Sequence, residues 1–187
     1  MNPRLRRFLN EVAAALGEGA QEAAIFGRVS AAMTELVGQD DWLPPEFEKP
    51  HPEFYQQYLL HRDSQDRFSV VSFVWGPVQK FPIHDHNVWG VIGMLRGSEY
   101  AQSYRCAEDG MRPEGLVERL LPGHVEKVSP TIGDIHQVSN AYDDRVSISI
   151  HVHGTDIGKR KRHAFDPATG VTKDFVSGYA NAPHEAT

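Results

Sequence analysis

The chain has 187 residues, of which 40% are hydrophobic and 24% are charged, and its formal net charge at pH 7 is -6. This composition is typical of a globular protein, and the length allows one domain over residues 1–187 with a substantial core. The acidic balance argues against a general nucleic-acid-binding protein, which would present a basic face.

Cysteine usage and the N-terminal residues bear on the cellular location. Cys106 is the single cysteine, which excludes an internal disulfide and a cysteine metal cluster and is typical of a reducing cytoplasm. The basic residues near the start are followed by Asn10 and Glu11, which interrupt the apolar run that a signal peptide needs. No apolar stretch approaches the length of a membrane span. We therefore expect a cytoplasmic protein that does not associate with membranes.

The first third of the chain predicts helices followed by an irregular connector. Apolar residues recur at three- and four-residue steps over residues 5–16 and again over 25–37, which indicates two amphipathic helices that pack on the main core. Glycines follow both segments and are expected to end them. Residues 42–52 contain several prolines and predict an ordered connector without regular structure.

From residue 68 onward the pattern changes to that of β-strands. Short segments rich in β-branched and aromatic residues are separated by glycine and proline, which is typical of an antiparallel sandwich or barrel. The expected strands cover residues 68–75, 88–95, 99–105, 116–121, 125–128 and 146–152. Residues 177–187 are expected to form an exposed or loosely docked tail.

Two histidines separated by one residue, His84 and His86, are the first candidate for a metal site. Side chains alternate along a strand, so both imidazoles can point to the same face and share one ion. Asp85 would point the other way and is expected to have a structural role. The pair by itself is weak evidence, because such pairs also occur in cores and on surfaces.

A second segment supplies the third histidine. The turn at residues 130–135 delivers His136 onto a following strand, four residues before Asn140. Together with the earlier pair and Gly97, this arrangement resembles the two motifs of the cupin superfamily. The resemblance implies a single cupin domain, a small antiparallel barrel of the jelly-roll type that holds a metal on the three histidines. It divides the chain into a helical segment and connector (about 1–50), a barrel (about 51–170) and a tail (about 171–187).

The sequence departs from the usual cupin pattern in lacking the glutamate that follows the histidine pair, since residues 87–90 fill that region. Three neutral imidazoles leave a metal with its full double charge and several open positions, which favours anionic ligands such as a thiolate and a carboxylate. The departure is similar to that of the thiol dioxygenases, which include cysteine dioxygenase. Further segments that resemble this family are residues 55–59, 75–76, 82–86, 133–136 and 149–151.

The resemblance implies one Fe(II) ion per chain, held by His84, His86 and His136. The implied reaction adds both atoms of O2 to the sulfur of a small thiol and gives a sulfinic acid. A three-histidine zinc cupin that acts as a hydrolase or isomerase is the alternative enzyme, and a non-catalytic ligand-binding cupin is the third interpretation. The expected partners are the small-molecule thiol and O2, in a monomer or small homo-oligomer.

The segment 147–153 alternates strictly between polar and apolar residues. The polar face lies either in solvent or in a cavity beside the metal, and we favour the cavity. Ser149 and His151 match two members of the family's Ser-His-Tyr relay, whereas His153 stands where the family has tyrosine. We hypothesise that His153 takes over the outer donor role and makes the rate depend on pH near neutrality.

Two further residues bear on the identity of the thiol. Gln57 stands where cysteine dioxygenases of the animal type have an arginine, and the bacterial branch similar to 3-mercaptopropionate dioxygenase has glutamine there. That branch carries a carboxylate-binding arginine in the position best matched by Arg162, with Arg160 as the alternative. A guanidinium binds a carboxylate through two parallel hydrogen bonds. The rest of the basic segment 159–163 is expected to be a solvated loop. 3-Mercaptopropionate is favoured, with L-cysteine and mercaptosuccinate left open.

Overall fold

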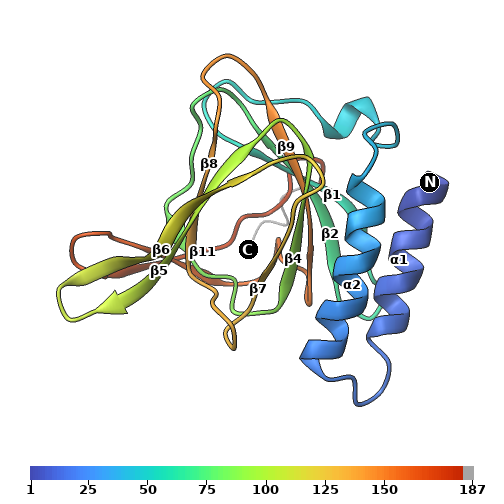
Figure 1. Ribbon diagram of the computed structural model, residues 1–187, viewed down its shortest axis with the longest axis horizontal. Helices are drawn as coiled ribbons and strands as arrows, with labels where there is room; N and C mark the ends of the chain where they lie inside the picture. The colour runs from blue at the N-terminus through green and yellow to red at the C-terminus, as the bar shows by residue number, and fades with distance from the viewer. Residues whose placement is uncertain (183–187) are drawn as a thin grey trace.

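Two antiparallel β-sheets face each other in the computed structural model, and a pair of helices covers the outer face of one sheet (Figure 1). The structure describes residues 1–182. The helices are α1 (Pro3–Ala15), α2 (Glu22–Val37) and the short 3-10 helix η1 (Pro45–Phe47). The strands are β1 (Gln56–Arg62), β2 (Ser69–Trp75), β3 (Ile83–His84), β4 (Gly90–Arg96), β5 (Glu99–Ala107), β6 (Gly110–Leu120), β7 (Val125–Val128), β8 (His136–Asn140), β9 (Ser147–His153), β10 (Arg162–Phe165) and β11 (Thr172–Phe175).

The strand order explains how residues far apart in sequence meet inside the barrel. One sheet has the order β1-β2-β9-β4-β7, and the other has the order β11-β10-β3-β8-β5-β6. The first histidine segment therefore lies in the sheet that also carries His136, while the polar strand β9 lies at the centre of the opposite sheet. The expected fold class, a mainly β antiparallel barrel with N-terminal helices packed on it, is confirmed.

The five-stranded sheet is buried on both faces because the helices cover one of them. Ile148, Ile150 and Val152 of β9 pack against the apolar faces of α1 and α2 in one core cluster. Gly93 lets α2 approach β4 closely, since a Cβ atom there would lie 2.6 Å from Cγ of Met33. The alternate residues of β9 must then face the barrel interior.

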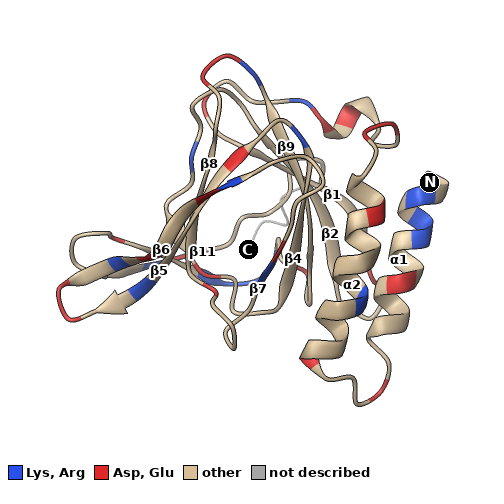
Figure 2. Cartoon of the chain, viewed as in Figure 1, with Lys and Arg blue, Asp and Glu red and all other residues tan. Residues whose placement is uncertain are grey.

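The exposed elements are the predominantly polar ones. The β5–β6 hairpin extends away from the barrel and carries both signs of charge near its tip, where Arg112 pairs with Asp109 (Figure 2). Among residues 1–182, no helix is long and apolar enough to cross a membrane.

The predicted strands are all found, with β7 matching at both ends, although β6 begins at Gly110 and not at the expected residue 116. Strand β1 was not predicted. The short strands β3, β10 and β11 were also not predicted, because each depends on pairing with distant partners rather than on a local pattern. β10 pairs with both β3 and β11, so the last two residues of the basic segment 159–163 lie in a strand and not in the expected solvated loop.

The expectation of a loosely docked tail is wrong for residues 177–182. Tyr179 is buried, and its hydroxyl accepts a hydrogen bond from the amide of Gly158 at 2.9 Å and donates one to Asp156. The amide of Ala180 donates to the carbonyl oxygen of Gln57. The segment is therefore fixed along β1 by a buried aromatic ring and backbone hydrogen bonds. Residues 183–187 of the predicted tail lie outside the described residues.

Candidate metal centre

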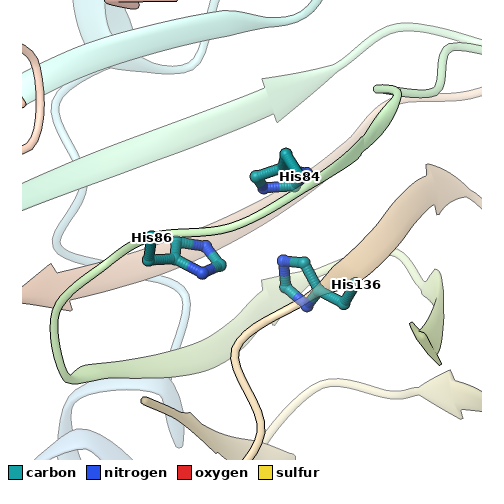
Figure 3. A group of neighbouring side chains, drawn as sticks. All are labelled: His84, His86 and His136. Atoms are coloured by element: carbon teal, nitrogen blue, oxygen red, sulfur yellow. The ribbon is translucent and has the colours of Figure 1, made fainter. Parts of the chain in front are cut away.

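Three histidines converge inside the barrel (Figure 3). His84 lies on β3, His86 lies two residues beyond it, and His136 begins β8 directly opposite His84. Their ring centroids lie 4.8 to 5.0 Å apart, one ring nitrogen from each lies within 4.8 Å of the others, and none is more than 7% exposed. The sequence prediction that these side chains meet is confirmed, although His86 is placed by a turn and not by an extended strand.

Hydrogen bonds fix the orientation of two of the rings. Nδ1 of His84 lies 3.0 Å from the carbonyl oxygen of Pro82, and Nδ1 of His86 lies 3.0 Å from a carboxylate oxygen of Asp134. Both partners are acceptors, so each Nδ1 carries the proton and each Nε2 is left with a free lone pair. This is the orientation in which imidazole binds a metal, with a carboxylate or carbonyl behind it.

Asp134 also shapes the turn that carries His86. Its carboxylate accepts hydrogen bonds from the amides of His86 and Asn87, and Asn87 has a φ of 56°, which bends the chain into the site. Burial alone would raise the pKa of Asp134, but these hydrogen bonds and the neighbouring His86 lower it. The carboxylate therefore stays ionised and holds the turn.

Two members of the triad, His84 and His136, are neutral at physiological pH. Burial, followed by the charges of its neighbours, lowers the pKa of His136 to about 3 and that of His84 well below its usual range. Neutral imidazole is the form that coordinates metals. Three imidazole nitrogen donors in a buried cluster fit a divalent transition-metal ion, and both iron and zinc accept this donor set.

The polar face of β9 lies inside the barrel and not in solvent. Its members Ser147, Ser149, His151 and His153 are all buried. Oγ of Ser149 lies 2.9 Å from Nε2 of His151, and the ring of His153 stacks on that of His86 with centroids 5.3 Å apart. The predicted residues Ser149, His151 and His153 therefore lie in a row beside the triad, and this row is called the relay line.

His153 differs from expectation in its electrostatics. Its ring fits over Gly90, where a Cβ atom would lie 2.9 Å from Cδ2 of the imidazole. Burial lowers the pKa of His153 well below its usual range, so the ring is neutral throughout the neutral pH region. The hypothesis that its titration makes a rate depend on pH near neutrality is wrong on this ground. Neither ring nitrogen of His153 has a hydrogen-bond partner among the described residues.

Arg162 is the buried member of the basic segment. It is 3% exposed and points to the same side of β10 as Ala164, which is paired with His84. One terminal nitrogen donates to Oγ of Ser177 at 2.7 Å, the guanidinium lies 4.6 Å from the centroid of Phe175, and Nε has no hydrogen-bond partner within residues 1–182. Its positive charge lowers the pKa values of the site histidines, and burial lowers its own.

The alternative, Arg160, is exposed and donates to the carbonyl oxygen of Asn87. The geometry thus favours Arg162 as the inward-facing cation. Asp85 faces the other way, as expected, and binds the amide and Nδ1 of His163 at 2.8 and 2.7 Å.

Gln57 lines the opposite wall of the barrel. It is paired with Phe73, which is paired in turn with Ser149, so all three side chains point inward. Its Nε2 donates to the carbonyl oxygen of Gly178 at 3.1 Å, while Oε1 has no hydrogen-bond partner in the described part of the chain. The ring of Phe73 lies 4.2 Å from that of His151 and fills the space between Gln57 and the relay line.

The sequence interpretation missed two inward-facing groups. Tyr55 stacks on Trp75 and Phe73, and Arg162 is close enough to lower its pKa against the raising effect of burial. Tyr55 lies directly before β1 and two residues before Gln57, a spacing from which a shared direction could have been predicted. Glu99 is 1% exposed at the start of β5, and no sequence pattern distinguished it from a surface residue.

An opening of about 160 Å³ lies between the free edges of the two sheets and reaches His136. Glu118 of β6 and Glu126 of β7 line it. The pKa of Glu126 is raised to about 7, first by burial and then by the nearby charge of Glu118. These two carboxylates and His124 form a second group with metal-ligand spacing, but that group is largely exposed.

Comparisons with known proteins return solved structures at low sequence identity. No protein-family model matches the sequence. A protein with a double-stranded β-helix domain from Klebsiella pneumoniae has a TM-score of 0.46 and 16% identity, over 69% of this chain and 90% of its own. An RmlC-like cupin from Desulfovibrio desulfuricans has a TM-score of 0.45 and 20% identity, over 59% and 92%. A cupin superfamily protein from Desulfitobacterium hafniense has a TM-score of 0.47 and 13% identity, over 63% and 94%.

The facing antiparallel sheets and the enclosed histidine triad of this chain define an antiparallel β-barrel with a candidate metal centre.

Proposed function

We propose that this chain is a cupin thiol dioxygenase that uses one mononuclear non-haem Fe(II) ion to add both atoms of O2 to the sulfur of a small carboxylated thiol. The product is a sulfinic acid, and the favoured substrate is 3-mercaptopropionate, with L-cysteine and mercaptosuccinate as the other candidates. The observation that carries the proposal is Arg162, a buried guanidinium that forms no ion pair within residues 1–182 and lies close enough to the histidine triad to lower the pKa values of His84 and His136.

The charge balance of the site supports an anionic substrate. A divalent ion held by three imidazoles keeps its full charge, and a buried guanidinium without an acidic partner is costly until an anion joins it. A molecule with a thiolate at one end and a carboxylate at the other would neutralise both. When bound, Fe(II) supplies the redox chemistry that joins O2 to sulfur.

The residues of the chain would orient the substrate and hold protons. The planar fork of Arg162 suits the carboxylate, with Ser177 fixing its orientation. The free Oε1 of Gln57 offers an acceptor on the opposite wall. His151, linked to Ser149, and His153 would place neutral ring nitrogens close to the reacting sulfur.

The experiment that tests this function is oxygen uptake by the Fe(II)-loaded protein with each of the three candidate thiols, with the product identified by mass spectrometry. We expect one O2 consumed per thiol and a mass increase of two oxygen atoms. A three-histidine zinc hydrolase or isomerase would instead retain zinc on purification and consume no O2. A protein that binds the thiols without converting them would be a non-catalytic cupin, and either result would contradict the proposal.

The other expectations about the protein stay predictions. They are a small-molecule thiol and O2 as partners, no binding to nucleic acid or membrane, a monomer or small homo-oligomer, and a cytoplasmic location.

A further inference from the structure

Glu99 is a buried carboxyl group that the proposed reaction does not use. It begins β5, where it is paired with Leu120 of β6 and Asn140 of β8. Oγ of Ser147 lies 3.3 Å from its Oε1, whereas Oε2 has no hydrogen-bond partner among residues 1–182. No basic side chain of the described residues forms an ion pair with it, so its ionised form is not compensated.

The surroundings of Glu99 keep the carboxyl group protonated at neutral pH. Burial raises its pKa to about 8, and the charge of Glu126 on β7 acts in the same direction. The hydroxyls of Ser149 and Ser147 on β9 act as hydrogen-bond partners and lower this pKa in part. Glu118 on β6 lies beyond Glu126 and raises the pKa of that residue.

A short path leads from Glu99 to the relay line. The hydroxyl of Ser149 lies close enough to the carboxyl group of Glu99 to lower its pKa, and it also lies 2.9 Å from Nε2 of His151. Nδ1 of His151 has no hydrogen-bond partner in the described chain, and the ring centroid lies 5.7 Å from that of His153, which stacks on His86. The far nitrogen of His151 is therefore the free end of a path that begins at Glu99.

The direction of these hydrogen bonds depends on the proton of Glu99. Ser149 has one hydroxyl proton, and burial keeps His151 neutral with one ring proton. When Glu99 is protonated it donates to Ser149, Ser149 donates to Nε2, and the ring proton sits on Nδ1. When Glu99 is ionised, Ser149 donates to the carboxylate, Nε2–H donates to Ser149, and Nδ1 becomes an acceptor.

We propose that Glu99 is a positioning residue that sets, through Ser149, which nitrogen of His151 carries the proton and thus whether the ring offers a donor or an acceptor to the cavity. At neutral pH the ring offers Nδ1–H, which suits the anionic ligand of the proposed function. A catalytic role for this tautomer rests on the proposed function. The control of the tautomer by Glu99 is independent of that function.

The direct test is the tautomer of His151 in the metal-free full-length protein, measured by NMR of ¹⁵N-labelled imidazoles between pH 6 and 10. The signals are assigned by their loss in His151→Asn. We expect Nδ1–H at pH 6.5 and a change to Nε2–H with a midpoint near pH 8. Glu99→Gln supplies an amide N–H donor to Ser149 at every pH, so the Nδ1–H form should persist to pH 10.

Two further variants test whether the proton of Glu99 acts through Ser149 or through a general change in the structure. Ser149→Ala removes the link, so the tautomer should no longer follow Glu99. Ser147→Ala removes a donor to the carboxylate and keeps the link, so the change should persist with a higher midpoint. A change near pH 8 that survives in Glu99→Gln, or a wild-type spectrum that stays constant from pH 6 to 10, would overturn the proposal.

Activity measurements distinguish this inference from the proposed function. With the Fe(II)-loaded protein, wild type should lose turnover above about pH 8, and Glu99→Gln should lack that alkaline limb. A protein that oxidises no thiol but shows the Glu99-dependent tautomer would overturn the function and leave the positioning role standing. A protein that oxidises a thiol but shows no tautomer change would support the proposed function and overturn the positioning role of Glu99.

Discussion

At the scale of single residues, the chemistry of the site follows from burial. His84 and His136 are neutral because burial lowers their pKa values, and Asp134 is ionised because His86 and amide donors lower its pKa. Arg162 stays buried although it forms no ion pair in the described part of the chain. A buried cation of this kind lowers the stability of the fold. A protein tolerates that cost where the cation binds an anion.

Metal content should depend on the buried triad and not on the exposed group. His136→Ala removes one of the three converging donors, so a sample loaded with one equivalent of Fe(II) or Zn²⁺ should lose its bound metal on desalting. His124→Ala alters the exposed cluster with Glu118 and Glu126 and should retain about one ion per chain. Elemental analysis measures both, and equal loss from the two variants would contradict the assignment of the centre.

Arg162 should determine affinity for the carboxylate. Loss of a charged hydrogen-bonding partner costs about 1.5–3 kcal/mol, so Arg162→Ala should raise the KM for 3-mercaptopropionate by roughly 10- to 100-fold. The KM for cysteamine, which has no carboxylate, should change far less. Arg160→Ala is the matched control, since Arg160 is exposed and bonds a backbone carbonyl. If Arg162→Ala raises the KM values of the two thiols equally, another residue binds the carboxylate.

At the scale of elements, β9 shows how one strand serves two environments. Its isoleucines and valine pack against the helices, and its serines and histidines face the metal centre. In a sheet with one solvated face, polar residues point outward. Here α1 and α2 occupy the outer face, so the polar residues are turned inward. The helices therefore determine which chemistry the barrel interior contains.

The contact between α2 and β4 should be sensitive to a single methyl group. A Cβ atom at position 93 would lie 2.6 Å from Cγ of Met33 and 2.8 Å from Cγ1 of Val37. Gly93→Ala should therefore lower the free energy of unfolding by about 1–3 kcal/mol. Gly27 lies in α2, and a Cβ atom there would meet no atom within 4 Å, so Gly27→Ala should leave the stability unchanged or raise it. Urea unfolding compares them, and equal stabilities would show that the contact is relaxed.

At the scale of the whole molecule, the chain segment after β11 fixes one side of the barrel. Residues 177–182 bond to β1 through Gln57 and Leu59, and Ser177 bonds Arg162. Tyr179 joins this segment to the loop that follows β9, because its hydroxyl bridges Asp156 and Gly158. The substrate-binding candidates therefore depend on the C-terminal segment for their positions.

Removal of the Tyr179 hydroxyl should loosen this side. Tyr179→Phe leaves the amide of Gly158 without its hydroxyl acceptor and removes one donor to Asp156, which keeps its ion pair with Arg62, at a cost of about 1–3 kcal/mol in unfolding free energy. Tyr100→Phe alters a residue that is 38% exposed and should change stability by less than about 0.5 kcal/mol. Thermal unfolding of the two variants tests this, and similar melting temperatures would indicate that the bridge contributes little.

The sequence by itself determined which residues are able to share a site. The resemblance to the cupin motifs added His136 to the pair His84 and His86. Alternation along β9 placed Ser149, His151 and His153 on one face, and alternation also allowed His84 and His86 to share a face. These relations are local, because a strand repeats every two residues whatever it packs against.

Only the tertiary structure decided which face is inside and which charged groups are buried. The inward direction of β9 depends on helices more than 100 residues earlier, and the choice of Arg162 over Arg160 depends on the pairing of β10 with β3. Glu99 and Tyr179 acquire their roles from partners on distant strands and loops. Burial of a charge or a hydroxyl is a property of everything packed around it, and the local pattern of the chain does not contain that information.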